Sequence, residues 1–226
     1  MSEIRIIGTS HIARQSVEEV KKAIFDFKPE IVAVELDFPR YQALMSGQKR
    51  RISLADIRYI GFKGFLFALI GEYAEKKLGK IVNTKPGADM ISAIRTAKQL
   101  NIPVALIDQE ISVTLRRFSK ALSWREKWNF VVDIVKGLVF GKKEMKKMGF
   151  EEIDLSKVPE KELIKKVMKV AGKRYPNLFR VLVTERNIYM AKMLVQIAKA
   201  NPEKKILAVV GAGHEEDIKR LVEKGI

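Results

Sequence analysis

The chain has 226 residues, a formal net charge of +16 and no cysteine. Without cysteine it has no disulfide framework, no thiol nucleophile, no iron–sulfur cluster and no Cys-ligated zinc site. Its hydrophobic content of 47% is that of a folded domain. The N-terminus lacks the apolar run of a secretory signal, and the most apolar stretch, residues 64–71, is shorter than the ~20 residues that span a bilayer. We therefore expect a cytoplasmic protein, with a composition that leans toward a thermophile.

The first forty residues predict a β–α–β unit. Residues 3–7 are a short β-prone run closed by Gly8, and residues 16–19, Ser-Val-Glu-Glu, have the pattern of a capping box that starts a helix. Pro29 ends that helix. Residues 31–36, Ile-Val-Ala-Val-Glu-Leu, then predict a strand that is buried on both faces, as in a parallel sheet.

The same order of helix and apolar strand returns twice. The Pro-Gly pair at 86–87 opens a predicted helix that leads into a strand over residues 102–108. A later helix runs to about Ala200, and residues 206–210 predict the last strand before a short helix over 215–223. This alternation indicates an α/β fold with a mostly parallel, mixed sheet.

The middle of the chain differs, because it holds most of the positive charge and no convincing strand. Residues 114–174 contain 17 basic and 8 acidic residues, so they carry +9 of the +16. We predict one domain over 1–226 with a basic helical insertion at 114–174. Trp124, Trp128 and Phe130, with interleaved Lys and Arg, fit either a face for nucleic acid or membrane, or aromatic packing into a core.

The position of the positive charge along the chain indicates which partners to expect. We do not expect nucleic acid as the partner, since the positive charge is away from every motif described below. Residues 114–150 predict contact with an anionic membrane, which would place the protein at the membrane periphery. A homo-oligomer is compatible with the sequence.

The two histidines of the chain stand in matching positions. His11 closes the segment Gly-Thr-Ser-His at 8–11, and His214 closes Gly-Ala-Gly-His at 211–214, each directly after a short apolar strand. Ligands of parallel sheets bind beyond the carboxyl ends of the strands, so both imidazoles are expected at that rim if the two strands point the same way. The alternative is that each histidine is an isolated loop residue or a helix cap.

Glu35 is a third candidate for the same rim, because it follows four apolar residues of a predicted strand. A buried carboxylate there needs a partner. With His11 and His214 it would form either a metal-binding set or an acid–base set. The alternative is that Glu35 pairs with Arg40 or another arginine.

Two further polar residues are expected near the rim. Asp108 ends the predicted strand over 102–108, and Arg186 begins the helix that leads into the last strand. An arginine there could clamp a carboxylate or stabilise an oxyanion. The alternative for Arg186 is a surface salt bridge at a helix start.

Five segments carry a resemblance to a known family. They are GTSH at 8–11, AVEL at 33–36, PGADM at 86–90, TER with YMA at 184–191, and VVGAGH at 209–214. Their sequences and their order resemble the TraB family, also called the PrgY or pheromone-shutdown family. That family is related to the Tiki metalloproteases, the GumN proteins and the erythromycin-esterase-like proteins.

The resemblance implies a fold in which His, Glu and Arg side chains meet in one cleft. In Tiki-like members, the two G-x-x-H motifs and an acidic residue support metal-dependent proteolysis, with manganese or cobalt favoured. Carried over by motif, His11, Glu35 and His214 become the metal ligands or catalytic residues. Arg186 becomes a further catalytic candidate. The resemblance also puts Arg40 and Asp108 in family-like positions, where we expect them to bind substrate.

The chain departs from the family pattern at three positions: Asp89 stands for the usual Glu, Gln109 for Arg and Asn187 for Asp. Gln109 removes a cation beside the expected rim. Many members carry C-terminal membrane helices, whereas this chain ends 12 residues after His214, as a minimal member or a part of a longer chain would.

The function expected from these residues and this resemblance is a metal-dependent hydrolase, in the first place a peptidase. It would use Mn, Co or Zn and act on a peptide or a small molecule. The alternative is a non-catalytic regulatory protein that binds a peptide or ligand in the same cleft.

Overall fold

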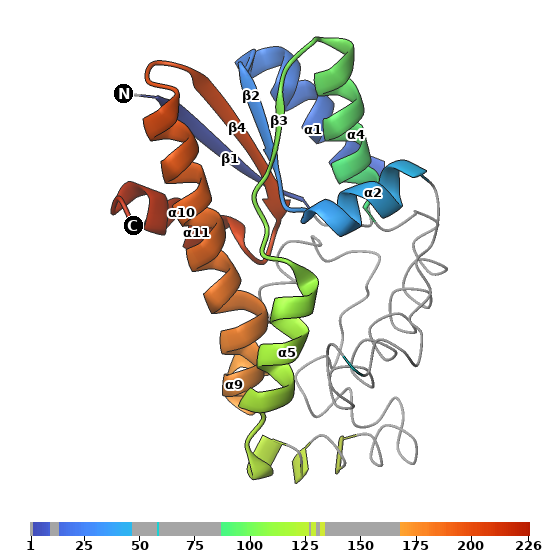
Figure 1. Cartoon of the computed structure of the whole chain (residues 1–226), viewed down its shortest axis with the longest axis vertical. Coiled ribbons are helices and arrows are strands. Elements are labelled where there is room, and N and C mark those ends of the chain that lie inside the picture. Colours follow the sequence, from blue (N-terminus) through green and yellow to red (C-terminus); the bar gives the residue numbers. More distant parts are fainter. Residues whose placement is uncertain are drawn as a thin grey trace.

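The computed structural model describes residues 2–9, 14–46, 58, 87–126, 128–129, 132–133 and 168–226. Within these ranges, four strands form one sheet in the order β1-β4-β2-β3, and every pair is parallel (Figure 1). The prediction of an α/β fold built on a parallel sheet is confirmed. The strands are β1 Glu3–Thr9, β2 Ile31–Val34, β3 Val104–Leu106 and β4 Lys205–Gly211.

Helices cover both faces of the sheet and extend beyond its carboxyl edge (Figure 1). One face carries α1 Arg14–Phe27 and α4 Ala88–Gln99, and the other carries α10 Glu185–Ala200 and α11 Glu215–Glu223. Beyond the carboxyl ends of the strands lie α2 Phe38–Ser46, α5 Ile111–Ala121 and α9 Pro176–Phe179. A π-helical turn, Arg180–Thr184, joins α9 to α10.

The two central strands bury side chains on both faces. Val32 and Val34 pack with the apolar residues of α1 and α4, whereas Ile31 and Ala33 pack with those of α10 and α11. Successive side chains of a strand point to opposite faces, so two helical layers require apolar residues at every position. This explains why β2 and β4 have continuous apolar sequences.

The ends of some elements differ from the prediction. α1 already has helical geometry at Arg14, so Ser16 lies inside its first turn and the prediction that residues 16–19 cap this helix is wrong. β2 ends at Val34 and β3 at Leu106, which leaves Glu35 and Asp108 just beyond their strands. Sequence signals set helix and strand ends only to within one or two residues.

The predicted insertion at 114–174 lies for the most part outside the described residues. Its described parts are helical except for residues 122–123. The single-domain prediction therefore stays a prediction. In the ranges that are described, no helix is both long and apolar enough to cross a bilayer.

Gly8, the first residue of the first G-x-x-H motif, is packed too closely for a side chain. A Cβ at this position would meet the Glu215 carboxylate, the Glu215 Cβ at 2.9 Å and the Ala212 Cα at 3.0 Å. Ala212 is backbone of the segment that carries His214, so it cannot yield without moving that motif.

We expect Gly8→Ala to lower the free energy of unfolding by about 1–3 kcal/mol, measured by urea titration, because of this overpacking. Gly172→Ala is the matched control. Its added Cβ would meet only the Phe179 ring, at 3.4 Å and beyond, so stability should stay the same or rise. Equal losses in both variants would contradict the packing argument.

Glu126 joins the described start of the insertion to α9. Its Oε2 accepts hydrogen bonds from the backbone N–H and hydroxyl of Ser123, both at 2.9 Å, and its Oε1 accepts from the Asn177 N–H at 2.7 Å. The Glu126 N–H in turn donates to the Ser123 hydroxyl oxygen at 3.2 Å, which completes a capping box. Asn177 lies in the first turn of α9. One carboxylate thus caps two helices, and it is 1% exposed.

These bonds make the stability of the protein pH-dependent. Burial raises the pKa of Glu126, but the hydrogen bonds from Asn177 and Ser123 outweigh it and lower the pKa from 4.5 to about 2. The folded state therefore gains stability from this carboxylate above pH ~4.5 and loses that gain as the pH falls toward ~2. We expect Glu126→Gln to cost about 2–3 kcal/mol at pH 7 and much less at pH 3.

Thermal unfolding at the two pH values measures this difference. Glu223→Gln, at an exposed position at the end of α11, is the control and should change stability by less than ~0.5 kcal/mol at both. A cost for Glu126→Gln that does not depend on pH would show that its carboxylate is not the cause.

Candidate functional site

The carboxyl ends of β2, β3 and β4 bring candidate residues to one edge of the sheet. Glu35 directly follows β2, Asp108 lies two residues beyond β3, and His214 lies three residues beyond β4, at the start of α11. Arg186 reaches this edge from the first turn of α10, which runs antiparallel to β4. The edge is the expected place for a ligand in a parallel α/β sheet.

Glu35 is held by two neighbours from different elements. Its Oε2 accepts a 2.7 Å hydrogen bond from the N–H of Gly211, the last residue of β4, and its Oε1 accepts from Nη2 of Arg186. The side chain is 6% exposed. Of the two alternatives, the structure shows that Glu35 pairs with an arginine, and that this arginine is Arg186 rather than Arg40.

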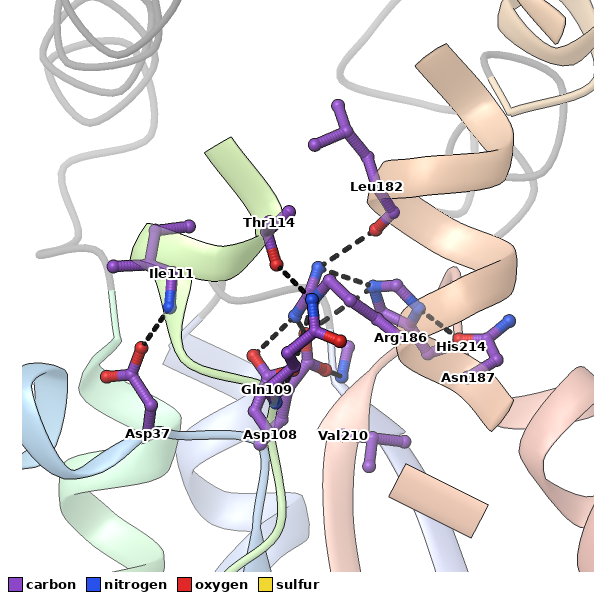
Figure 2. A network of polar contacts seen from close by, with 12 residues as sticks. Asp37, Asp108, Gln109, Ile111, Thr114, Leu182, Arg186, Asn187, Val210 and His214 are labelled. Carbon is purple, nitrogen blue, oxygen red and sulfur yellow. Dashed lines mark hydrogen bonds and ion pairs between the residues drawn. The ribbon is translucent and has the colours of Figure 1, made fainter. Parts of the chain in front are cut away.

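Arg186 has all five N–H groups directed at protein acceptors. Nε–H donates to Asp108 Oδ1 at 3.0 Å, and Nη2 donates to Asp108 Oδ2 at 2.7 Å and to Glu35. Nη1 donates to the Leu182 carbonyl at 3.2 Å and lies 3.4 Å from Nε2 of His214. A guanidinium has five donors, so none remains for a ligand unless one of these contacts opens. Figure 2 shows this side chain between Asp108 and the imidazole.

The electrostatics of Arg186 agree with this geometry. Burial by itself lowers its pKa, but the charges of Glu35 and Asp108, and the hydrogen bonds to them, raise the pKa above the ordinary arginine value. The cation is therefore fixed in charge and in place. Its side chain is 15% exposed, which rules out the predicted alternative of a surface salt bridge.

Asp108 links the two arginines of the site. Besides Arg186, it accepts from Nη2 of Arg40 and, through Oδ1, from the Gln109 N–H at 2.7 Å. Its side chain is fully buried. Gln109 itself points to Thr114, whose hydroxyl accepts from Gln109 Nε2 at 2.9 Å, so this residue bridges the rim to α5.

Arg40 differs from Arg186 because it keeps free donors. Its Nη2 donates to Asp108, and its Nε lies 3.4 Å from Asp37 Oδ1 without forming a hydrogen bond. Neither N–H of Nη1 has an acceptor among the described residues, and 34% of the side chain is exposed. Asp37 also accepts from the backbone N–H groups of Arg40 and Ile111, both at 2.7 Å, and so ties α2 to α5.

His214 is oriented by Asn187 (Figure 2). Nδ1 of the imidazole lies 2.6 Å from Asn187 Oδ1, while Asn187 Nδ2 donates to Asp217 at 3.3 Å. Because the amide nitrogen faces the carboxylate, its oxygen faces the ring, and His214 carries its proton on Nδ1. Nε2 then carries the lone pair of the ring, and it lies 3.4 Å from both Glu35 Oε1 and Nη1 of Arg186.

The π-helical turn before Arg186 contributes to the site. Its Leu182 carbonyl accepts from Arg186 Nη1, four residues later. Widened turns of this kind occur often at functional sites. Nothing in the sequence marks this turn, since residues 180–184, Arg-Val-Leu-Val-Thr, continue the helical pattern on both sides.

At the outer end of the sheet, Thr9 and Asp89 form a second buried pair. The Thr9 hydroxyl donates to the Asp89 carboxylate, and both residues are 1% exposed. Asp89 stands in the first turn of α4, after Gly87 with φ of 78°. Glycine tolerates this left-handed conformation, and Gly87 therefore fits the position directly before α4.

Five of the six predicted site residues thus meet in one network: Glu35, Arg40, Asp108, Arg186 and His214. The sixth, His11, lies outside the described residues. Asp37 was missed by the sequence reasoning, although an acid two residues after Glu35 was a usable signal. Asn187 was noted only as a departure from the family pattern, and its contact with His214 could not be read from the sequence.

A metal ion is implied by the resemblance, and the donors at the rim can be tested for it. His214 Nε2 and Glu35 Oε1 lie 3.4 Å apart, which is about the spacing of two ligands with ~2.1 Å bonds on one tetrahedral ion. Among the described residues no group of three His, Asp or Glu converges as a metal site. The two donors fit half of such a site, and the other predicted ligand is His11.

Comparisons with known proteins agree with these motifs. The sequence pattern of the TraB/PrgY/gumN family matches residues 2–224. An uncharacterized protein of Methanocaldococcus jannaschii is 34% identical over 226 residues, which cover 98% of this chain and 54% of the relative. TraB domain-containing proteins of Mus musculus and Bos taurus are 26% and 27% identical over 243 residues, which cover 97% of this chain.

The chain spans about half the length of the archaeal relative and 62% of the two mammalian ones. The family pattern includes the segments that carry Glu35, Arg186 and His214, and it extends over nearly the whole sequence. The predicted resemblance is confirmed, and this chain belongs to the TraB/PrgY/gumN family.

Proposed function

We propose that this chain is a metal-dependent hydrolase, in the first place a peptidase, whose reacting groups are Glu35 and His214. The observation that carries the proposal is the 3.4 Å spacing of His214 Nε2 and Glu35 Oε1 at the carboxyl edge of the sheet. A carboxylate and an imidazole at this spacing can share one ion or one water molecule. When bound, a divalent ion such as Mn, Co or Zn supplies Lewis acidity and makes water a stronger acid.

The roles of the two reacting groups follow from their fixed neighbours. Nε2 is the unprotonated nitrogen of His214, since Asn187 holds the proton on Nδ1, and it would bind a metal if its 3.4 Å contact with Nη1 of Arg186 opened. Glu35 lies beside the Arg186 cation, which favours its carboxylate form, and its Oε1 is the atom that faces His214 Nε2. Both groups are predicted ligands of the metal together with His11.

Arg186 is then a positioning residue rather than a substrate clamp. Its five donors hold Glu35, Asp108 and the Leu182 carbonyl and approach His214. The predicted role in stabilising an oxyanion would require one of these contacts to open. Its effect on the reaction is to fix the carboxylate and the imidazole relative to each other.

Arg40 is the residue that fits an anionic group of the substrate. It is one-third exposed and keeps both N–H groups of Nη1, whereas Asp108, the other predicted substrate-binding residue, is fully buried behind it. Guanidinium groups bind carboxylates through paired hydrogen bonds. The substrate class is therefore a peptide or small molecule with a free carboxylate near the bond that is cleaved.

Glu35→Gln tests the proposal in protein purified without chelator. We expect the wild type to hold a divalent ion by elemental analysis and to cleave a mixture of fluorogenic peptides with added Mn²⁺, Co²⁺ or Zn²⁺. Glu35→Gln should lose both, while circular dichroism shows that it is folded. Glu18→Gln, at a position 72% exposed on α1, is the control that should keep both. Unchanged metal content and cleavage in Glu35→Gln would refute the proposal.

A non-catalytic ligand-binding protein is the second candidate. The free donors of Arg40 favour it, because they can hold an anion without any turnover. Calorimetry with the same peptides, together with product analysis by mass spectrometry, separates the two candidates. Binding that depends on Arg40, without cleavage under any of the three metals, would establish this second function.

A further inference from the structure

The two tryptophans of the chain are displayed at the surface. Trp124 is 84% exposed and Trp128 is 69% exposed. They are four residues apart in helical segments, so they lie on one side of the chain there. The sequence leaves open whether these rings pack into a core; the structure shows that the two tryptophans do not, whereas Phe130 lies outside the described residues. Large exposed aromatic groups on a folded domain mark a binding surface more often than chance.

Three exposed cations flank the tryptophans in the sequence. Arg116, Lys120 and Arg125 are exposed, and no acidic partner is found for any of them among the described residues. The nearby carboxylate, Glu126, is buried and used by Ser123 and Asn177. We call Arg116, Lys120, Trp124, Arg125 and Trp128 the tryptophan–arginine surface. It combines two indoles with three uncompensated positive charges.

This surface is distant from the rim of the sheet. In Figure 1, the described residues among 124–133 lie beyond the far end of α5, well below β1 and β4. None of its residues takes part in the contacts of Glu35, Arg186 or His214. Its role is therefore separate from the proposed hydrolase site.

We propose that the tryptophan–arginine surface docks the protein on a bilayer that contains anionic lipids. Indole rings are amphipathic and favour the headgroup level of a membrane, and each nearby Lys or Arg adds attraction to anionic headgroups. The contact that we propose is made at the surface of the bilayer, through these side chains. Single-stranded nucleic acid also uses aromatic rings and cations, but it is held along a charged groove. The short helical segments that carry the tryptophans lie beyond the far end of α5 (Figure 1).

The intrinsic fluorescence of the protein reports on this contact, because Trp124 and Trp128 are the only tryptophans in the chain. On addition of vesicles of phosphatidylcholine with 30% phosphatidylglycerol, we expect the emission to shift to the blue as the indoles leave water. Vesicles of phosphatidylcholine alone should give no shift. Salt at ~0.5 M should reverse the shift, since it screens exposed charges.

Two variants test the surface by co-sedimentation with the same anionic vesicles. Replacing Arg116, Lys120 and Arg125 by glutamine should weaken binding about fivefold per cation removed, or about 100-fold in total. Replacing both tryptophans by serine should weaken it by about tenfold or more. The matched controls are Phe25→Ser, an exposed aromatic residue on α1, and Lys199→Gln, an exposed cation on α10, and both should bind as the wild type.

Three outcomes would overturn this proposal. The first is that anionic vesicles cause neither a shift nor sedimentation. The second is a shift that single-stranded DNA causes at low salt and anionic vesicles do not, which would assign the surface to nucleic acid. The third is a blue shift that depends on protein concentration alone, which would assign it to a second copy of this chain. Circular dichroism of both variants checks that they are folded.

Discussion

Replacing Arg186 by methionine is expected to lower the free energy of unfolding by about 3–5 kcal/mol, the largest stability effect of any single change at the site. The guanidinium holds Asp108, whose side chain is fully buried, and Glu35, which is 6% exposed. Without it, two buried carboxylates lose the cation that they share, and Asp108 keeps its contact with Arg40. Urea titration monitored by circular dichroism measures the loss.

The matched control is Arg117→Met. Arg117 pairs with Glu185 at 3.0 Å, but 56% of its side chain is exposed, so water screens the pair. Its removal should cost less than about 1 kcal/mol. The loss of unfolding free energy in Arg186→Lys should lie between the losses in Arg186→Met and Arg117→Met, because lysine keeps the charge but cannot donate five directed hydrogen bonds. Similar losses for Arg186→Met and Arg117→Met would show that the buried network is not held by this cation.

Replacing His214 by alanine is expected to lower kcat/KM in the peptide assay by about 10²–10⁴-fold, the range of a lost acid–base group. Asn187→Leu should lower it by about 10–100-fold, because the ring then loses the acceptor that fixes its proton on Nδ1. Asn187→Asp keeps an acceptor at the same place and should recover most of the activity. The loss in Asn187→Leu should appear in kcat rather than in KM, since Asn187 does not touch the substrate.

Asn201→Ala is the control for these variants. Asn201 lies at the far end of α10, where its side chain donates to the Ile197 carbonyl, and its replacement should leave kcat/KM unchanged. The assignment of His214 fails if His214→Ala retains the wild-type rate. The role given to Asn187 fails if Asn187→Asp is as impaired as Asn187→Leu.

The family membership of the chain does not by itself establish either the proposed hydrolase activity or the proposed membrane contact. The relatives that cover nearly this whole sequence are uncharacterized or are known by the domain name alone, and they extend well beyond it. Activity, metal and partners therefore rest on the chemistry of the rim and of the tryptophan–arginine surface. Because the two lie apart in the molecule, the experiments on one do not depend on the outcome of the other.

The sequence alone predicted the helices and strands that alternate through the sheet, and the edge of the sheet at which the candidate residues lie. β2 and β4 were predicted because a central parallel strand needs apolar residues on both faces, which gives a continuous run such as Ile31–Val34. Glu35 and His214 were found because polar residues directly after such strands must lie at the carboxyl edge of the sheet. Both inferences use periodicity and chain direction, which are local properties.

Only the tertiary structure decided which groups contact each other. The pairing of Glu35 with Arg186 rather than Arg40 joins residues 151 positions apart, and the tautomer of His214 depends on an amide from another helix. Likewise, the sequence could not separate buried from exposed tryptophans, because helical spacing is the same for a core face and a surface face. Contacts between distant segments, and therefore donor counts and exposure, are set by how the layers pack.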